Sequence, residues 1–378
     1  MNSISELKCA IMLQYVLGLG SCKVVKIYEK YGNAYNFFYG QQDLKTSLLS
    51  PAEVSRLKSV DVTLADDILS RCDELSINCV HFLQGEYPDL LKEIDNPPVV
   101  LYYKGKLPDN SLPLFCIVGS RKLSSFGTKA AFSLGYRLTL GGISIVSGIA
   151  NGADTQALRG ALKACGKPVC IMPCGLGVNY LNEFTALRRD IISNGGCLLS
   201  ECTPNMPVYS NSFHLRNRLL SGISLGVGVI EAAQKSGTLI TAHIACEQGR
   251  DVFVIPGNPT DSGYKGSNEL LCEGAIPLLN AECIFNQYEY KYPNIIDVEK
   301  AFRNCRQEID NFHKRIIKKD KGCLSDDAWN VYNLIKNKVF VPGDIDYNGD
   351  MQSLLAALSE LEFFGYISAL PGNSFEVI

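Results

Sequence analysis

The sequence predicts an α/β protein whose centre is a doubly wound parallel sheet with helices on both faces. Between residues 114 and 279, short apolar runs rich in β-branched residues alternate with segments of helical length. The runs are apolar at nearly every position, as in parallel strands that are buried on both faces and joined by crossover helices. The arrangement is Rossmann-like, although the dinucleotide-binding pattern GxGxxG is absent.

We place this central domain at residues 85–290, where strands and helices follow one another in a regular order. The predicted strands are Leu114–Val118, Ile143–Val146, Val169–Met172, Cys197–Leu199, Leu225–Ile230 and Val252–Ile255. The predicted helices are Gly127–Leu140, Ala153–Cys165, Glu183–Asn194, Leu215–Ser221 and Thr238–Glu247. Such alternation is typical of βαβ units.

Residues 1–84 are predicted to form a small helical domain. Apolar residues recur at helical spacing before and after the turn Gly18-Leu19-Gly20. Two helices joined by a Gly-x-Gly turn are typical of a helix-hairpin-helix or SAM-like unit. Such a turn can present backbone N–H groups to a phosphate. The alternative is a tight interhelical turn that holds no ligand.

The C-terminal part is predicted as a linker, residues 291–320, followed by a winged-helix domain, residues 321–378. The order of its elements is that of a small winged helix: a helix from Asp326, a turn at Pro342–Gly349, a helix over Met351–Phe364, and strands at Tyr366–Leu370 and Ser374–Ile378. Residues 321–378 carry eight acidic and three basic residues. This charge argues against binding to duplex DNA and favours contact with protein.

Composition excludes several other classes of protein. Of the 378 residues, 46% are hydrophobic and 20% are charged, as in ordinary globular proteins. No apolar stretch approaches the roughly 18 residues of a membrane-spanning helix, and the N-terminus lacks the pattern of a signal peptide. The cysteines number 15, form no CxxC pair and have only four histidines as co-ligands. We therefore expect reduced thiols, a cytoplasmic location, and neither a metal site nor a disulfide framework.

Small polar residues follow the predicted strands, at the sheet edge where α/β proteins bind ligands. Gly119-Ser120-Arg121 follows the first strand, Ser147-Gly148 follows the second, and Ser236-Gly237-Thr238 begins a helix after the fifth. Glycine permits close approach of the backbone, and a helix N-terminus favours an anion. The sequence therefore predicts a phosphate-binding edge, with tight βα turns that hold no ligand as the alternative.

One segment, residues 213–218, adds an aromatic ring and positive charge to this edge. An exposed ring stacks on a base while a guanidinium binds phosphate, so Phe213 beside arginine suits single-stranded nucleic acid. Packing of Phe213 in the core is the alternative. Arg216 and Arg218 lie two residues apart, so on a helix they point in nearly opposite directions and at most one faces the pocket. We expect the other to pair with Glu201 or Glu231.

The motifs, taken in order, resemble those of the bacterial DNA-processing protein A (DprA/Smf) family over about residues 85–285. They are Val118-Gly119-Ser120-Arg121, Ser147-Gly148-Ile149-Ala150, Cys174-Gly175-Leu176, Leu199-Ser200-Glu201, Phe213 to Arg218, Val229-Ile230-Glu231-Ala232, Ser236 to Ala242 and Pro256-Gly257. The resemblance implies a non-enzymatic protein that binds single-stranded DNA, forms a homodimer, protects incoming DNA and helps load the RecA recombinase in natural transformation or recombination.

The resemblance also implies roles for particular residues. In that family the strand-end Gly-Ser-Arg meets the DNA backbone, and the aromatic residue before Arg-Asn-Arg stacks on or packs against the strand. The predicted DNA-binding residues are Gly119, Ser120, Arg121, Ser147, Gly148, Phe213, Arg216, Asn217, Arg218, Ser236, Gly237 and Thr238. No catalytic residue and no cofactor are predicted.

The sequence departs from the family pattern at Leu158, Leu181, Phe184 and His214. Three of these positions usually carry a histidine, a proline and an asparagine in the family, and His214 replaces a proline. The changes predict a divergent member with weakened DNA affinity. The alternative function is a nucleotide-binding hydrolase of the phosphoribohydrolase type, in which Glu231 assists N-glycosidic cleavage.

Overall fold

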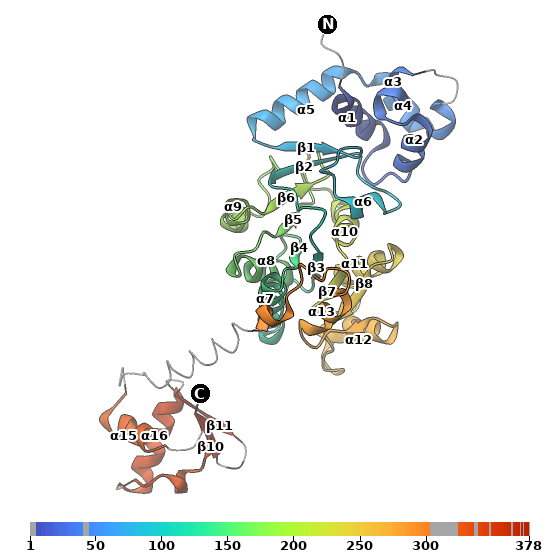
Figure 1. Cartoon of the computed structure of the whole chain (residues 1–378). Helices are drawn as coiled ribbons and strands as arrows, with labels where there is room; N and C mark the ends of the chain where they lie inside the picture. Colours follow the sequence, from blue (N-terminus) through green and yellow to red (C-terminus); the bar gives the residue numbers. More distant parts are fainter. Residues whose placement is uncertain are drawn as a thin grey trace. The chain divides into compact units, whose positions relative to one another are not determined.

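The structure, a computed structural model, describes residues 5–40, 45–302, 324–335, 339–347, 349–363, 366–370, 372 and 374–377. The chain divides into two compact units, Met1–Phe302 and Arg303–Ile378 (Figure 1). None of the helices in these described ranges combines the length and apolarity that a bilayer crossing requires.

The first unit is built on a nine-stranded sheet with the order β1-β2-β6-β5-β4-β3-β7-β8-β9. Its strands are β1 (Asn78–His81), β2 (Val100–Gly105), β3 (Leu114–Val118), β4 (Ser144–Ser147), β5 (Val169–Ile171), β6 (Cys197–Ser200), β7 (Gly226–Val229), β8 (Asp251–Val254) and β9 (Ile276–Pro277). From β6 to β9 the neighbouring strands pair in parallel, whereas β2 is antiparallel to β6 and to β1. The parallel-dominated sheet confirms the predicted Rossmann-like α/β fold.

The helices of the first unit form an N-terminal group and a group that connects or follows the strands. The N-terminal group is α1 (Glu6–Leu17), α2 (Val24–Tyr31), α3 (Ala34–Tyr39), the 3₁₀ turn η1 (Lys45–Leu48), α4 (Pro51–Ser59) and α5 (Val62–Glu74). The second group is α6 (Asp89–Lys92), α7 (Ser125–Leu140), α8 (Ala153–Lys163), η2 (Asn182–Phe184), α9 (Thr185–Ser193), α10 (Ser212–Gly222), α11 (Gly237–Glu247), η3 (Ser262–Tyr264), α12 (Lys265–Cys272) and α13 (Glu282–Tyr288).

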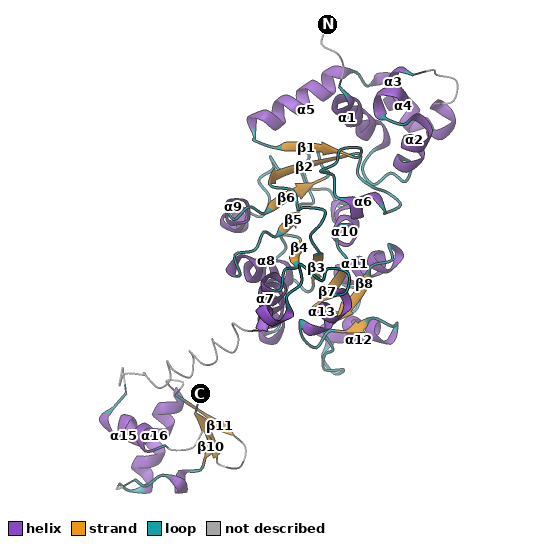
Figure 2. Ribbon diagram, in the orientation of Figure 1, coloured by secondary structure: helices purple, strands orange, loops and turns teal. Residues whose placement is uncertain are grey.

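Strand β3 illustrates why this sequence forms a sheet that is covered on both faces. All five of its residues are buried. Cys116 packs into the core that contains Leu219 of α10, whereas Phe115 packs into the core that contains Leu138 of α7. Because successive side chains of a strand point to opposite faces, a strand that is apolar at every position needs helices on both sides. Figure 2 shows α7 and α8 on one side of the strands and α10 and α11 on the other.

The central strands and helices that the sequence predicts are all present, with ends that differ by at most a few residues. The sequence analysis missed β1, β2 and β9. Strand β1 lies in a segment for which only helices are predicted, and β9 has two residues. These strands join the sheet at its edges through pairing with distant segments, such as Tyr102 with Ser200, which local patterns do not record.

The second unit contains two helices and a three-stranded antiparallel sheet of order β10-β12-β11. Its elements are α15 (Asp326–Leu334), β10 (Val339–Phe340), the 3₁₀ turn η4 (Pro342–Asp344), α16 (Met351–Phe363), β11 (Ile367–Leu370) and β12 (Ser374–Val377). Val331, Leu358, Leu361 and Ile367 belong to a core of its own. Of the predicted linker 291–320, residues 303–320 lie outside the described residues.

Candidate nucleic-acid interface

A cleft of about 290 Å³ lies where the carboxyl end of β3 meets the starts of α8 and α11. Strand β3 lies between β4 and β7, so the strand order changes direction here, at the switch point where doubly wound sheets bind ligands. Nine of the predicted DNA-binding residues line the cleft: Gly119, Ser120, Arg121, Phe213, Arg216, Asn217, Ser236, Gly237 and Thr238. The structure thus brings together segments that are more than 100 residues apart in the sequence.

Arg121 and Phe213 meet at this cleft. The guanidinium carbon of Arg121 lies over the Phe213 ring, 5.4 Å from the ring centroid. Arg121 is exposed and Phe213 is half-buried. The position of a guanidinium over a ring face is favourable in itself, and both groups keep surface for a ligand. An exposed cation beside an accessible aromatic ring is the pair that a phosphate and a base require.

The loop that carries Arg121 is fixed by backbone contacts. Ser120 N donates to Glu231 O at 2.8 Å, and Ala153 N donates to Ser120 O at 3.2 Å. Gly152 has φ +88°, and a Cβ atom there would come within 2.2 Å of Ser120 O. Only glycine tolerates both conditions, so Gly152 lets the start of α8 pack against the loop. Arg121 therefore extends from an anchored turn.

Arg216 and Asp154 lie at the floor of the cleft and are 8% and 6% exposed. Arg216 Nη1 donates to Ile171 O at 3.3 Å. Among the described residues, Arg216 Nε has no hydrogen-bond partner. Burial raises the pKa of Asp154, and the charge of Arg216 opposes this shift. A buried donor without a partner is costly, so the floor retains capacity to bind an acceptor.

The N-terminus of α11 forms another wall of the cleft through Ser236, Gly237 and Thr238. No side-chain cap is present for this helix among the described residues, and Ser236 Oγ is buried there without a hydrogen-bond partner. Uncapped N–H groups at a helix start carry partial positive charge. This wall therefore suits a phosphate oxygen.

Two predicted residues support the cleft without lining it. Ser147 is fully buried, and its hydroxyl donates to Ile117 O at 2.6 Å, which ties β4 to β3. A Cβ atom at Gly148 would lie 1.8 Å from Arg216 Nη1 and 2.4 Å from Asp154 Oδ2. Gly148 therefore provides the space that the two charged groups of the floor occupy.

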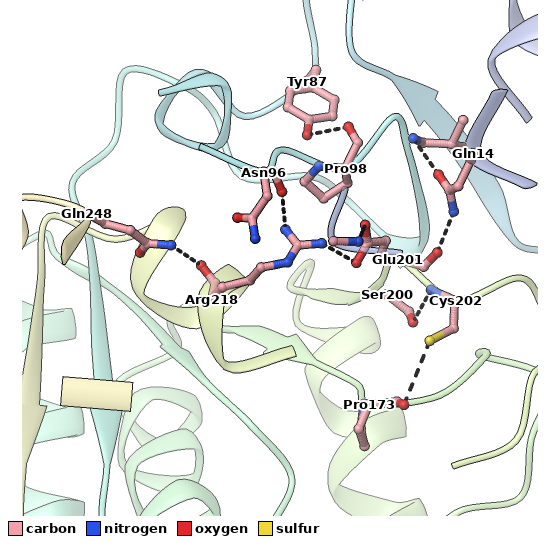
Figure 3. A network of polar contacts seen from close by, with 12 residues as sticks. Gln14, Tyr87, Asn96, Pro98, Pro173, Ser200, Glu201, Cys202, Arg218 and Gln248 are labelled. Atoms are coloured by element: carbon pink, nitrogen blue, oxygen red, sulfur yellow. Dashed lines mark hydrogen bonds and ion pairs between the residues drawn. The ribbon is translucent and has the colours of Figure 1, made fainter. Parts of the chain in front are cut away.

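Arg218 is not brought to the cleft, so we remove it from the predicted interface. It is 4% exposed, forms an ion pair with Glu201, and donates through Nη1 to Asn96 O at 2.6 Å (Figure 3). The expectation that at most one of the two arginines faces the pocket is confirmed, because their offset of two residues places them on opposite sides of α10. The structure identifies Glu201, not Glu231, as the partner.

The turn Gly18-Leu19-Gly20 contacts the same carboxylate. Gly20 N donates to Glu201 Oε1 at 3.2 Å, and Gln14 Nε2 donates to Glu201 O at 2.7 Å. Gln14 Oε1 in turn accepts from Val100 N at 2.7 Å. A protein carboxylate thus takes the hydrogen bond that a phosphate would receive. This arrangement favours the alternative interpretation of the turn, a tight connection that holds no ligand.

Glu231 accepts hydrogen bonds at the start of α7. Its carboxylate accepts from Ser124 N at 3.0 Å, from Ser124 Oγ at 2.5 Å and from the Tyr264 hydroxyl at 2.8 Å. It is buried and does not line the cleft. A carboxylate that is occupied by these donors is poorly placed to assist cleavage of a glycosidic bond, which argues against the hydrolase alternative.

The departures from the family pattern lie largely outside the cleft. Leu158 and Phe184 are buried in an apolar cluster beneath the loop after β5, Leu181 packs against that cluster, and His214 is exposed. Asp154 is a residue of the cleft that the sequence analysis does not single out. It lies in the segment that follows the second predicted strand, at the sheet edge where ligands are expected, and this position could have identified it. No cluster of metal-ligating side chains occurs in the described ranges.

Fold and cleft together define a class: an α/β protein of the Rossmann type with an anion-suited site at its switch point. Comparison with known proteins identifies the family. The family described as DNA recombination-mediator protein A matches residues 78–289. The chain is 38% identical over 204 residues to the DNA processing protein DprA of Streptococcus pneumoniae, which covers 54% of this chain and 72% of that protein. It is 30% identical over 288 residues to the protein Smf of Escherichia coli, covering 76% and 74%.

Solved structures agree with this assignment. The X-ray structure of DprA from Streptococcus pneumoniae matches with a TM-score of 0.64 and 30% identity, over 75% of this chain and 98% of that one. A structure of DprA from Helicobacter pylori, described as showing a single-stranded DNA binding mode, matches with a TM-score of 0.51 and 27% identity, over 57% and 97%. The chain belongs to the DNA recombination-mediator protein A family, as the motifs predict. The names in this family describe DNA processing and recombination mediation, not a catalysed reaction.

Proposed function

We propose that this protein binds single-stranded DNA in the cleft at the end of β3. The observation that carries the proposal is the placement of Arg121 over the Phe213 ring, beside the uncapped start of α11. A base stacks on the ring, while the guanidinium and the helix N–H groups receive the adjacent phosphates. The single-stranded DNA complex described for the Helicobacter pylori relative supports this ligand.

The net charge of the sheet domain does not attract DNA, so the complex depends on local groups. Residues 81–290 carry 17 basic and 17 acidic residues, so this part of the chain has no overall attraction for DNA. Binding then depends on the local groups of the cleft, where Arg121 and Arg216 outnumber Asp154. We expect a salt dependence that corresponds to few phosphate contacts.

The proposal includes the cellular role that the resemblance implies. The protein would protect incoming single strands and help load RecA in natural transformation or recombination, acting as a homodimer in the cytoplasm. The family description as a DNA recombination mediator supports the part of this role that concerns recombination. The cysteines among the described residues are free thiols, which fits a reducing compartment.

The flanking domains complete the proposal. The N-terminal helices act as a helix-hairpin-helix or SAM-like domain, residues 1–84. This domain packs against the sheet domain and does not bind DNA. The second unit acts as a winged helix, residues 321–378, and its eight acidic against three basic residues favour a protein partner. Two helices with a three-stranded antiparallel sheet are compatible with this assignment.

Replacement of Arg121 tests the proposal. Arg121→Gln removes one charged contact, so the affinity for oligo-dT should fall about tenfold. The slope of log affinity against log salt should flatten by about 0.7, the value for one phosphate of a single strand. Fluorescence anisotropy at several salt concentrations measures both quantities.

Arg159→Gln is the matched control, because Arg159 is an exposed arginine of α8 that does not line the cleft. Its affinity and salt slope should equal those of the unmodified chain. Equal curves for Arg121→Gln and the control would refute the proposal. A duplex of the same length, which cannot stack its bases on Phe213, should bind more weakly than the single strand.

A further inference from the structure

A second cavity, of about 530 Å³, lies beside α9. It is open to the surface and is lined by strand β2, strand β6, α9 and the loop after β5, and within the described part of the chain it shares no lining residue with the DNA cleft. The apolar part of its lining consists of Met172, Leu176, Val178, Ile192 and Leu198. Its volume is in the range of ligand pockets.

The charged lining of this cavity has one sign. Lys104, Arg188 and Arg189 line it, and no acidic residue does so in the described ranges. The DNA cleft, by comparison, has two arginines and the carboxylate of Asp154. The cavity beside α9 is therefore the more positive of the two sites, in a part of the chain that is neutral overall.

Arg188 has a structural task. It donates through Nη1 to Tyr180 O and through Nη2 to Thr185 Oγ1 at 3.0 Å. Leu181, which follows Tyr180, has φ +49°, a conformation that L-residues other than asparagine and aspartate rarely adopt. Arg188 is thus a positioning residue that holds the loop after β5 in this shape.

The side chains of Lys104 and Arg189, in contrast, do not hold another segment in position. Among the described residues, neither side chain has a hydrogen-bond or ion-pair partner. Lys104 is half-buried, and this burial lowers the pKa of its amine. Its partner in the neighbouring strand β6 is the apolar Leu198. A half-buried amine beside an apolar surface is stabilised when an anion pairs with it.

The cavity beside α9 combines an apolar surface with cations, and this combination distinguishes between a free phosphate and a nucleotide as its ligand. A free phosphate would use the cations and leave the apolar surface unused. A nucleotide uses both, because its base covers apolar side chains while its phosphate binds an amine or guanidinium. The lining therefore fits a nucleotide unit.

One loop connects this cavity with the DNA cleft. Residues 176–179 of the loop line the cavity. At the start of the same loop, Arg216 of the cleft floor donates through Nη1 to Ile171 O at 3.3 Å, and the next residue, Met172, lines the cavity. The floor of the cleft and the lining of the cavity therefore meet at adjacent residues of the chain, Ile171 and Met172.

We propose that the cavity beside α9 is a second nucleotide subsite, in which Lys104 and Arg189 bind the backbone of the same DNA strand that occupies the cleft. This inference rests on the proposed function. It predicts that a long strand makes contacts that a short strand cannot reach.

The double variant Lys104→Gln/Arg189→Gln tests the subsite. Oligo-dT of about 4 nucleotides should fill the cleft alone, whereas about 16 nucleotides should reach both sites. The variant should bind the short strand within about twofold of the unmodified chain and the long strand about tenfold more weakly. For the long strand its salt slope should flatten by about 1.4, twice the value for one phosphate.

The matched control is Arg159→Gln/Lys163→Gln, which removes one arginine and one lysine from exposed positions of α8 outside both sites. If the Lys104 substitution lowers stability, Arg189→Gln alone, at an exposed position, should still flatten the slope by about 0.7. Long-strand affinity equal to that of the control overturns the inference.

Two further outcomes separate the possibilities. In one outcome the unmodified chain binds dTMP, the double variant does not, and the salt slope for the long strand is the same in both. The cavity would then be a site for free nucleotides, and the proposal that one DNA strand occupies both sites would be overturned. If Arg121→Gln weakens binding of the long strand and the double variant does not, the proposed function stands and the subsite alone is rejected. Failure of the unmodified chain to bind either strand would reject both.

Discussion

Glu201 joins three parts of the first unit through one side chain and its own carbonyl. Its carboxylate pairs with Arg218 of α10 and accepts from Gly20 N, while its carbonyl accepts from Gln14. Glu201 is 5% exposed and Arg218 is 4% exposed. Because α10 also carries Phe213 and Arg216, this pair fixes the helix that forms one wall of the cleft.

We expect Glu201→Gln to destabilise the protein strongly. The substitution leaves the Arg218 guanidinium buried without a counter-charge, and breaking a buried pair in this way costs about 3–5 kcal/mol. Urea unfolding followed by circular dichroism measures the change in free energy of unfolding. Glu74→Gln is the control, because the Arg71–Glu74 pair is exposed and such pairs contribute about 0–1 kcal/mol. Equal losses in the two variants would contradict the assigned role of the buried pair.

The two arginines of α10 show how far residue-level inference reaches. Their spacing alone predicts that they diverge, and the structure bears this out. Which of them faces the cleft depends on the rotation of α10, which the packing of Leu219 and Leu220 against the sheet sets. Those contacts involve strands that are distant in the sequence, so the spacing could not select Arg216 over Arg218.

At the scale of elements, the start of α7 depends on a small polar network. Ser124 caps the helix by accepting from Gly127 N at 2.9 Å, and its hydroxyl and backbone N–H both donate to Glu231. The Tyr264 hydroxyl donates to the same carboxylate at 2.8 Å. The network ties α7 to the end of β7 and to the 3₁₀ turn before α12.

Ser124→Ala should lower the free energy of unfolding by about 2 kcal/mol, since it removes a helix cap and one hydrogen bond to a buried carboxylate. Ser125→Ala is the matched control. Ser125 is an exposed residue in the first turn of the same helix, and its replacement should change stability by about 0.5 kcal/mol or less. Denaturant unfolding of both variants compares them, and a Ser124 variant as stable as the control would show that the network adds nothing.

The parallel strands were predictable because each is a buried apolar run between helices of regular length. Strands β1, β2 and β9 lack that signal. Strand β2 ends in Tyr103, Lys104 and Gly105, which become half-buried only when β6 pairs with it in antiparallel fashion. The cavity beside α9 was missed for the same reason, because Lys104 reaches Leu198 through that pairing and not through any motif.

At the scale of the whole molecule, the candidate DNA contacts all belong to one unit. The cleft and the cavity beside α9 are lined by residues of Met1–Phe302. The second unit has its own apolar core and its own antiparallel sheet. Residues 303–378 carry nine basic and eleven acidic residues, so their net contribution to attraction for DNA is small.

A chain that ends at residue 302 should therefore bind oligo-dT within about twofold of the full chain, with the same salt slope, because the phosphate contacts that set the slope are retained. Charges of the second unit that lie beyond the Debye length of about 10 Å at 0.1 M salt are screened. Anisotropy titrations of both chains at two salt concentrations measure the ratio, and the Arg121→Gln substitution in each chain provides the control, since it should lower both affinities equally. A tenfold loss on truncation, with the unfolding midpoint of the first unit unchanged, would place essential DNA contacts in the second unit.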